Sequence, residues 1–140
     1  MSDSSVRRVV GGISAFAVAA GFAVVGAGIA GAAPASVTWN DGNEKITRTV
    51  SEANPAEGDI VTTSTKLERT GGVVEYIYAL KDIHPTCMTY VPGSAKVNGQ
   101  ARNLHSQAPD FAKVEGSAVE WPLRALVNAN SYTFEFQYKV

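Results

Sequence analysis

The chain has 140 residues, with 12 Lys and Arg against 13 Asp and Glu and a formal net charge of −1 at pH 7. The basic residues after the first ten positions are scattered singly, which excludes the clustered positive charge of a nucleic-acid-binding protein. The single cysteine excludes an internal disulfide.

The N-terminal segment has the pattern of an export signal. Arg7 and Arg8 precede an uncharged, apolar run from Val9 to Ala33 that ends in small residues. Signal peptidase requires a short basic segment, a hydrophobic stretch and an A-x-A-like end. We therefore expect residues 1–32 to be a signal peptide that forms a signal helix, with cleavage after residue 35 as the alternative.

The same apolar run is long enough to cross a bilayer, which needs about 20 such residues, so an uncleaved anchor is the competing interpretation. Its residues are mostly Ala and Gly with little Leu or Ile, which favours cleavage. We expect a secreted or cell-envelope protein that touches the membrane only through this segment, if the segment is retained. Cleavage after residue 32 leaves 108 residues, the size of one domain.

Apolar residues in the mature part of the chain recur with a period of two, which predicts an all-β fold. Turn residues such as Asn-Asp-Gly and Pro-Gly separate the apolar runs. The expected strands, about seven, lie near residues 37–40, 45–50, 59–68, 73–81, 88–91 with 94–97, 117–123 and 131–140. In the last strand one apolar face carries Tyr132, Phe134, Phe136, Tyr138 and Val140.

The strand near 117–123 should form a second wall of the core. Val119, Trp121 and Leu123 alternate with polar or small residues, and Leu126 is expected to close the turn that follows. Trp121 should be deeply buried against Phe134 from the facing sheet, because both supply large apolar areas.

The strand near 73–81 offers a third candidate for a core face. Tyr76, Tyr78 and Leu80 share one face, which we expect to point inward, and Ile77 lies on the other.

Several short motifs, in this order, resemble the DUF11 type of bacterial surface domain. They are Asn54-Pro55-Ala56-Glu57-Gly58-Asp59, Arg69-Thr70-Gly71, Asp82 to Pro85, Met88 to Gly99, and Val119-Glu120-Trp121-Pro122-Leu123. The resemblance covers residues 51–140 and implies an immunoglobulin-like Greek-key β-sandwich, to which residues 33–50 add N-terminal strands. Such domains usually occur as tandem repeats in large secreted or wall-attached proteins. The Ala- and Gly-rich signal is also similar in style to those of high-GC actinobacteria.

The chain departs from that family pattern at two turns. Arg69-Thr70-Gly71 stands where the family usually has Asn-x-Gly, and Asn128-Ala129-Asn130 stands where it usually has Pro-Gly. The sequence also contains one copy of the domain, so the spacer role that tandem copies serve does not carry over.

Cys87 has two interpretations. Free cysteine is among the most buried residue types, so we expect a core thiol and a monomeric protein. A disulfide to Cys87 of a second chain is the alternative, because an exported compartment permits disulfides and the cysteine has no partner in its own chain.

His84 and Cys87 stand three residues apart, a spacing that could begin a metal site or a Cys–His dyad. Structural zinc needs four ligands, and the other histidine of the chain, His105, lies in a different segment. A thiol nucleophile needs a base that a third group orients. We expect neither a metal site nor a dyad, and we place His84 in a partly exposed turn.

The acidic residues also have structural interpretations. Asp59 and Asp82 are expected at strand edges, where short polar side chains bond nearby backbone amides. The segment Asp41 to Glu44 is a turn and supplies too few oxygens for Ca²⁺, which takes six to eight. A Lys–Asn isopeptide bond would need an inward lysine, and Lys66 alternates outward.

The sequence contains no Ser-His-Asp arrangement, Gly-rich phosphate loop or zincin motif. We expect a non-enzymatic protein without cofactor, which presents a sheet face or its end loops to an unknown protein or envelope component. The alternative is a small-ligand carrier, with a pocket lined by the Tyr-rich surface and by residues 100–116. We expect that segment to be a surface loop with one short edge strand near Phe111 to Val114.

Overall fold

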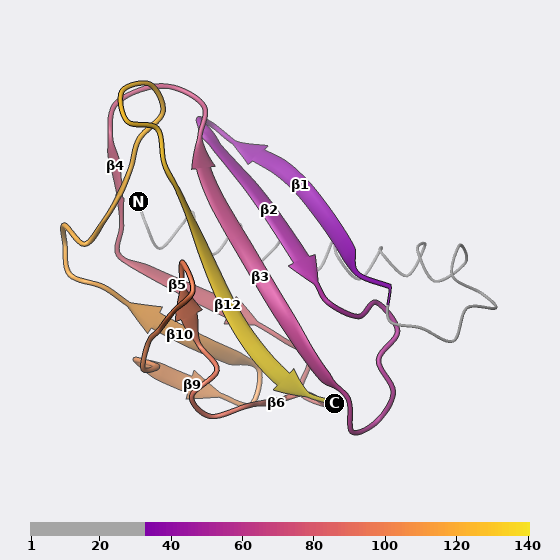
Figure 1. Ribbon diagram of the computed structural model, residues 1–140. Helices are drawn as coiled ribbons and strands as arrows, with labels where there is room; N and C mark the ends of the chain where they lie inside the picture. Colours follow the sequence, from indigo (N-terminus) through magenta and orange to yellow (C-terminus); the bar gives the residue numbers. More distant parts are fainter. Residues whose placement is uncertain (1–32) are drawn as a thin grey trace.

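The computed structural model describes residues 33–140, and in this part the chain forms twelve strands joined into antiparallel sheets (Figure 1). The signal peptide and its helix, expected over residues 1–32, lie outside the described residues. The strands are β1 (Ala35–Asp41), β2 (Glu44–Val50), β3 (Ile60–Arg69), β4 (Glu75–Ile77), β5 (Ala79–Ile83), β6 (Thr89–Tyr90), β7 (Lys96–Val97), β8 (Gln100–Ala101), β9 (Ser106–Ala108), β10 (Phe111–Glu115), β11 (Trp121–Leu123) and β12 (Ser131–Lys139).

The larger sheet has seven strands in the order β1-β2-β3-β12-β7-β8, with β6 also pairing β12. Its four long strands form an antiparallel ladder, in which β12 pairs β3 from Ser131↔Glu68 to Lys139↔Ile60. Gly42, at φ 60°, makes the tight turn between β1 and β2, a backbone conformation that favours glycine. This ladder confirms the expected strands near 37–40, 45–50, 59–68 and 131–140 to within two residues.

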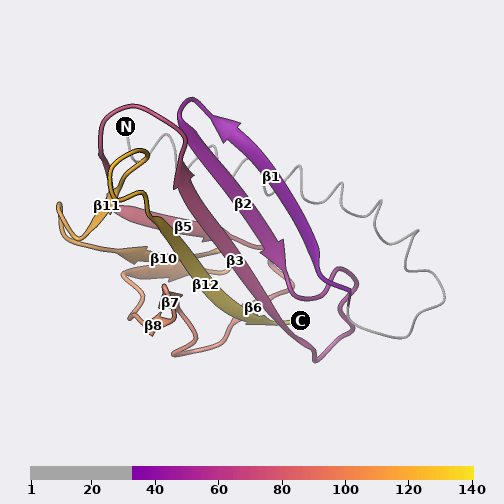
Figure 2. The same cartoon turned by 45° about the horizontal axis from the view of Figure 1, so that its top comes forward.

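The second layer consists of two smaller sheets, β5-β10-β9 and β11-β4, which lie against one face of the long ladder (Figure 2). The strand near Phe111 to Val114 is confirmed as β10. It is the middle strand of its sheet, however, because β5 and β9 pair with its two sides. The expectation that it is an edge strand was therefore wrong.

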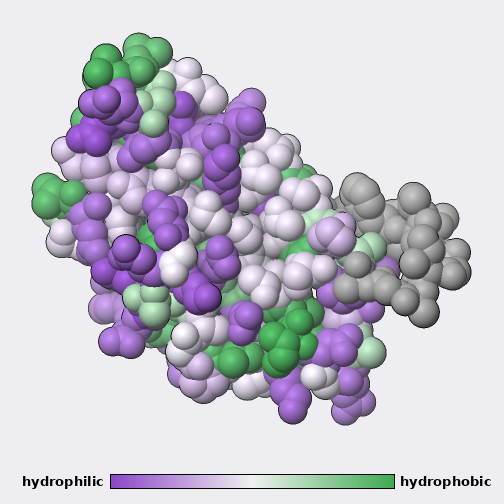
Figure 3. All heavy atoms as spheres, in the orientation of Figure 1, coloured by the Kyte–Doolittle hydropathy of each residue, from purple (hydrophilic) through white to green (hydrophobic). Residues whose placement is uncertain are grey.

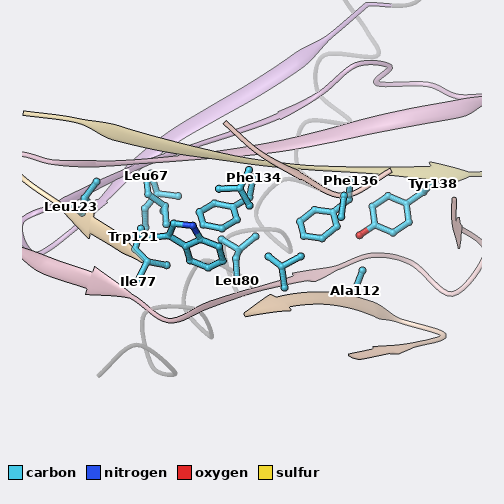
Figure 4. Packing of buried hydrophobic residues seen from close by; sticks show 13 residues of the cluster. Leu67, Ile77, Leu80, Ala112, Trp121, Leu123, Phe134, Phe136 and Tyr138 are labelled. Atoms are coloured by element: carbon cyan, nitrogen blue, oxygen red, sulfur yellow. The ribbon is translucent and has the colours of Figure 1, made fainter. Parts of the chain in front are cut away.

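The hydrophobic core lies between the two layers. Phe134, Phe136 and Tyr138 of β12 point toward Leu80 and Trp121 of the second layer (Figure 4). The rings of Trp121 and Phe134 meet edge to face at 86°, with centroids 5.2 Å apart. Both are buried, at 4% and 0% exposed, which confirms the expected aromatic contact between facing sheets.

The expected face of the 73–81 segment was wrong, because the chain changes sheets in its middle. β4 pairs β11 and ends at Ile77, whereas β5 begins at Ala79 and pairs β10. The break at Tyr78 shifts the alternation by one residue, so that Ile77 and Leu80 are both buried while Tyr78 is 44% exposed. This change of sheet is one reason for the number of strands exceeding seven.

Val119, which was expected in the second wall of the core, lies at the surface, and so does Leu126, which was expected to close the next turn. Val119 is 70% exposed because residues 117–120 form a turn, closed by the Glu120 amide donating to the Ser117 carbonyl oxygen at 3.2 Å. Leu126 is 79% exposed in the loop between β11 and β12. Of the strand predicted over 117–123, only the last three residues form a strand, which is β11.

Candidate functional site

A buried polar network joins the two layers, and it is the largest departure from an apolar core. Asp82 of β5 forms an ion pair with Arg48 of β2, and the two side chains are 0% and 3% exposed. Thr63 donates a hydrogen bond to the Asp82 carboxylate at 2.8 Å, and Arg48 Nη1 donates to Thr65 Oγ1 at 2.9 Å. A buried charge pair needs such additional hydrogen bonds to offset its loss of hydration.

Tyr138 completes this polar network from β12. Its hydroxyl donates to Asp82 Oδ2 at 2.6 Å. Burial, and next the negative charge of Asp82, raise the pKa of Tyr138 far above its ordinary value, so the hydroxyl stays protonated and remains a donor. Asp82 therefore accepts from three side chains and has no free position toward solvent, which favours a structural role over a catalytic one.

The structure contradicts two expectations about the segment that follows. His84 is buried, at 5% exposed, and it is not a partly exposed turn residue; its ring packs against that of Tyr138, with the centroids 4.3 Å apart and the planes tilted by 40°. Its Nδ1 donates to the Pro85 carbonyl oxygen at 2.9 Å. Cys87 is exposed, so the expected burial of its thiol was also wrong. The turn that carries Pro85 and Cys87 projects from the core that holds His84.

The network also corrects the interpretation of Asp82, which was expected to bond nearby backbone amides at a strand edge. Asp59 does follow that expectation, because its carboxylate accepts from the Ala56 amide at 2.8 Å. Asp82 instead bonds side chains from β2, β3 and β12. Sequence reasoning missed Arg48 altogether, although it shares the inward strand phase of Ile46.

A second acidic group sits at the opposite end of β2. Glu44 is 7% exposed and lies beside Glu75, which forms an ion pair with Arg69. Burial, and next the charge of Glu75, raise the pKa of Glu44 to about 7. This carboxyl therefore titrates near neutral pH.

A pocket of about 290 Å³ opens beside Trp121. Val97, Asn98, Gln100, Arg102, Glu120, Trp121 and Tyr132 line it. Arg102 donates to Glu120 Oε2 at 3.1 Å and lies 5.2 Å from the centre of the Trp121 ring. The hydrogen bonds from Arg102 lower the pKa of Glu120. The charged groups of this pocket thus neutralise each other.

Exposed aliphatic side chains gather at one end of the ladder. Val73 and Val74 follow β3, and Leu126 and Val127 precede β12; they are 80%, 40%, 79% and 78% exposed. Their two loops are neighbours, because Glu75 and Leu123, where the loops join β4 and β11, are paired. We call these four residues the apolar apex. Figure 3 shows apolar residues at the end of the molecule where Figure 1 places these loops.

Within residues 33–140, no three His, Cys, Asp or Glu side chains group closely enough to hold a metal ion. The same residues contain no helix long and apolar enough to span a membrane. Lys66 forms an ion pair with Glu68 at 3.3 Å on the outer face of the ladder, as its strand phase predicts.

Comparison of the chain with protein-family models, with curated proteins and with solved structures gives no match.

Proposed function

We propose that this protein is an exported, non-enzymatic interaction module that binds a protein of the cell envelope through its apolar apex. The observation that carries the proposal is the exposure of four aliphatic side chains on two adjacent loops. Exposed apolar residues scattered singly are ordinary, whereas a contiguous group marks an interaction surface.

A protein partner fits the apex better than a lipid surface does. The residues after position 32 include 10 Lys and Arg against 12 Asp and Glu, so the exported chain is slightly acidic. Binding to an anionic bilayer gains from clustered basic residues, which are absent from this sequence. A protein surface can instead desolvate the aliphatic side chains within a polar rim.

We also propose a fold family and a cellular location for this protein. We assign the all-β architecture to the immunoglobulin-like Greek-key sandwiches of the DUF11 type, on the motifs between residues 51 and 140. Export rests on the signal pattern of residues 1–32, and intact-mass measurement of material from the host's medium and envelope tests it. A chain that starts at Ala33 or Ser36 supports export by cleavage. A membrane-bound chain of full mass would make the protein a tethered ectodomain.

The partner can be tested with a photo-crosslinking residue in place of Ala129, an exposed position in the apex loop. We expect one defined cross-linked species in the native host. The triple variant Val73→Ser, Leu126→Ser and Val127→Ser should abolish that species with little loss of stability, because surface substitutions usually change stability by about 0.5 kcal/mol or less.

Ile60→Ser provides the matched control for this experiment. Ile60 is 49% exposed and pairs with Lys139, at the end of the ladder away from the apex. The control should keep the cross-linked species. Equal loss in both variants, or a species that depends on neither, would contradict recognition through the apex.

A small-ligand carrier is the second candidate, and the pocket beside Trp121 favours it. Gln100 and Arg102 come from the segment proposed for this role, and Tyr132 adds one aromatic side chain. The volume of the pocket, about 290 Å³, is at the lower end of the range for ligand pockets. Arg102→Gln would weaken the binding of a ligand in this pocket and leave the cross-linking at the apex unchanged, so the two functions can be separated.

The non-enzymatic assignment is supported by the environments of Asp82 and His84, neither of which is free to contact a substrate. Asp82 is saturated by three donors, and His84 is buried against Tyr138. General acid–base catalysis needs a titratable group within reach of a substrate.

A further inference from the structure

β1 forms one edge of the larger sheet, and among residues 33–140 no strand pairs with its outer side. The Ser51 amide donates to the Thr62 carbonyl oxygen, which sets the hydrogen-bond phase of the ladder. Odd-numbered residues of β2 bond toward β3, and even-numbered residues bond toward β1. In β1, therefore, the odd-numbered residues bond to β2, and the backbone groups of Ser36, Thr38 and Asn40 face outward.

This edge lacks the features that normally prevent strands from pairing between molecules. Natural edge strands are short, bulged, or carry lysine or proline. β1 has seven residues, contains neither lysine nor proline, and keeps an unbroken register with β2 from Ala35↔Val50 to Asp41↔Glu44. The edge strands β8 and β9 are protected by their length, since they have two and three residues. The edge strand β5 has five residues but carries Lys81.

We propose that β1 pairs antiparallel with β1 of a second copy of this chain, with Thr38 opposite Thr38 of the other copy. The outward backbone groups match in this register, because Ser36 faces Asn40 and each such pair exchanges two hydrogen bonds. No charged residue opposes a like charge, since the one charged residue of β1, Asp41, faces Ala35. This contact does not use the apolar apex, so it goes beyond the proposed function.

The side chains of the inner face support the same register. Trp39 and Val37 are half-buried in the structure, and Trp39 packs against the core cluster. Across the two-fold axis Trp39 of each copy would lie opposite Val37 of the other, in a pair whose side chains approach closely. Aromatic and β-branched residues are a favourable cross-strand pair. On the outer face, hydroxyl contacts such as Thr38 to Thr47, at 3.0 Å, would continue into the second copy.

Sedimentation of the exported chain carrying Cys87→Ser tests the contact, because this background excludes disulfide-linked dimers. A strand pair alone buries less area than a permanent interface, so we expect a reversible dimer whose fraction rises with concentration. Thr38→Pro should return the mass to that of one chain, since its amide faces outward and proline there removes no bond to β2. Thr38→Ala keeps the amide and should keep the dimer.

Charge substitutions test the register itself. Thr38→Lys alone and Thr38→Glu alone should each be monomeric, because like charges would face each other across the axis. An equimolar mixture of the two variants should restore the dimer. A wild-type chain that stays monomeric at every concentration would overturn the proposal. So would a dimer that survives both Thr38→Pro and Thr38→Lys, and so would a mixture that stays monomeric.

Discussion

Arg48 on β2 and Asp82 on β5 join the two layers of the sandwich through an ion pair that is withdrawn from solvent. Thr65 accepts a hydrogen bond from Arg48 Nη1, and Thr63 and Tyr138 donate to the Asp82 carboxylate. The partners are 34 positions apart in the chain and lie in different sheets, so this contact links the two layers directly.

Removing one partner of this pair should be strongly destabilising. We expect Asp82→Asn to cost about 3–5 kcal/mol, because Arg48 would be left as an uncompensated buried charge. Arg48→Met should cost a similar amount, and the double variant should cost less than the sum of the two. Urea denaturation of the three variants measures the coupling. Additive effects would mean that the two side chains do not depend on each other.

A larger residue at Gly116 should be destabilising, because Gly116 packs on the face of Trp121. A Cβ at this position would lie 3.1 Å from ring atoms of Trp121 and 2.9 Å from the Glu120 carboxylate. We expect Gly116→Ala to cost about 1–3 kcal/mol, the range for overpacking. Gly71→Ala is the matched control, since its nearest neighbour would be Asn43 Oδ1 at 3.8 Å. Similar free energies of unfolding for the two variants would contradict this contact.

Stability should fall as the pH rises between about 4.5 and 7. The pKa of Glu44 is about 7 in the folded protein and 4.5 in its ordinary state, so the folded chain binds the proton more tightly in this window. The protonated form is stabilising below pH 4.5, and this contribution, about 3 kcal/mol by the linkage relation, is lost as the pH rises to and through 7. Glu44→Gln should flatten the dependence and be more stable than the parent at pH 8. Parallel curves for the two proteins would count against it.

Cys87 should react rapidly with a thiol reagent in the native state, because its side chain is exposed. We expect the rate to approach that of the unfolded chain, and Cys87→Ser to change the free energy of unfolding by about 0.5 kcal/mol or less. Stopped-flow labelling before and after denaturation gives the comparison. A thiol that reacts only after unfolding would restore the buried interpretation.

Much of the fold could be predicted from the alternation of apolar and polar residues, which is regular wherever a strand stays in one sheet. β12 and β3 are long, with one buried face and one face toward solvent, so the residues of the buried face follow directly from the sequence. The second layer was predicted less well, because its short strands change partners. At Tyr78 the chain leaves β11 for β10, and a periodic pattern read through that point acquires the wrong phase.

The buried polar network was missed for a different reason. An arginine, two threonines and an aspartate each have ordinary surface roles, and only their shared inward phase indicates otherwise. Arg48 follows Ile46 by two positions, and Thr63 and Thr65 lie between Val61 and Leu67 on the buried face. A sequence pattern cannot show that these phases meet across two sheets, because strand alternation does not specify which strands face each other.

The ladder also determines how the sandwich would respond to mechanical force. β1 starts and β12 finishes at one end of the larger sheet, while the loops of the apolar apex project from the other. Tension between these two strand ends would pull β1 away from β2 and break the hydrogen bonds of that pair one after another, starting at Ala35. Strands loaded in this peeling direction separate more easily than strands sheared along their length, where many bonds must break together. The geometry therefore suits a domain that is held at one end and displays its loops at the other, and it is poorly suited to carrying tension.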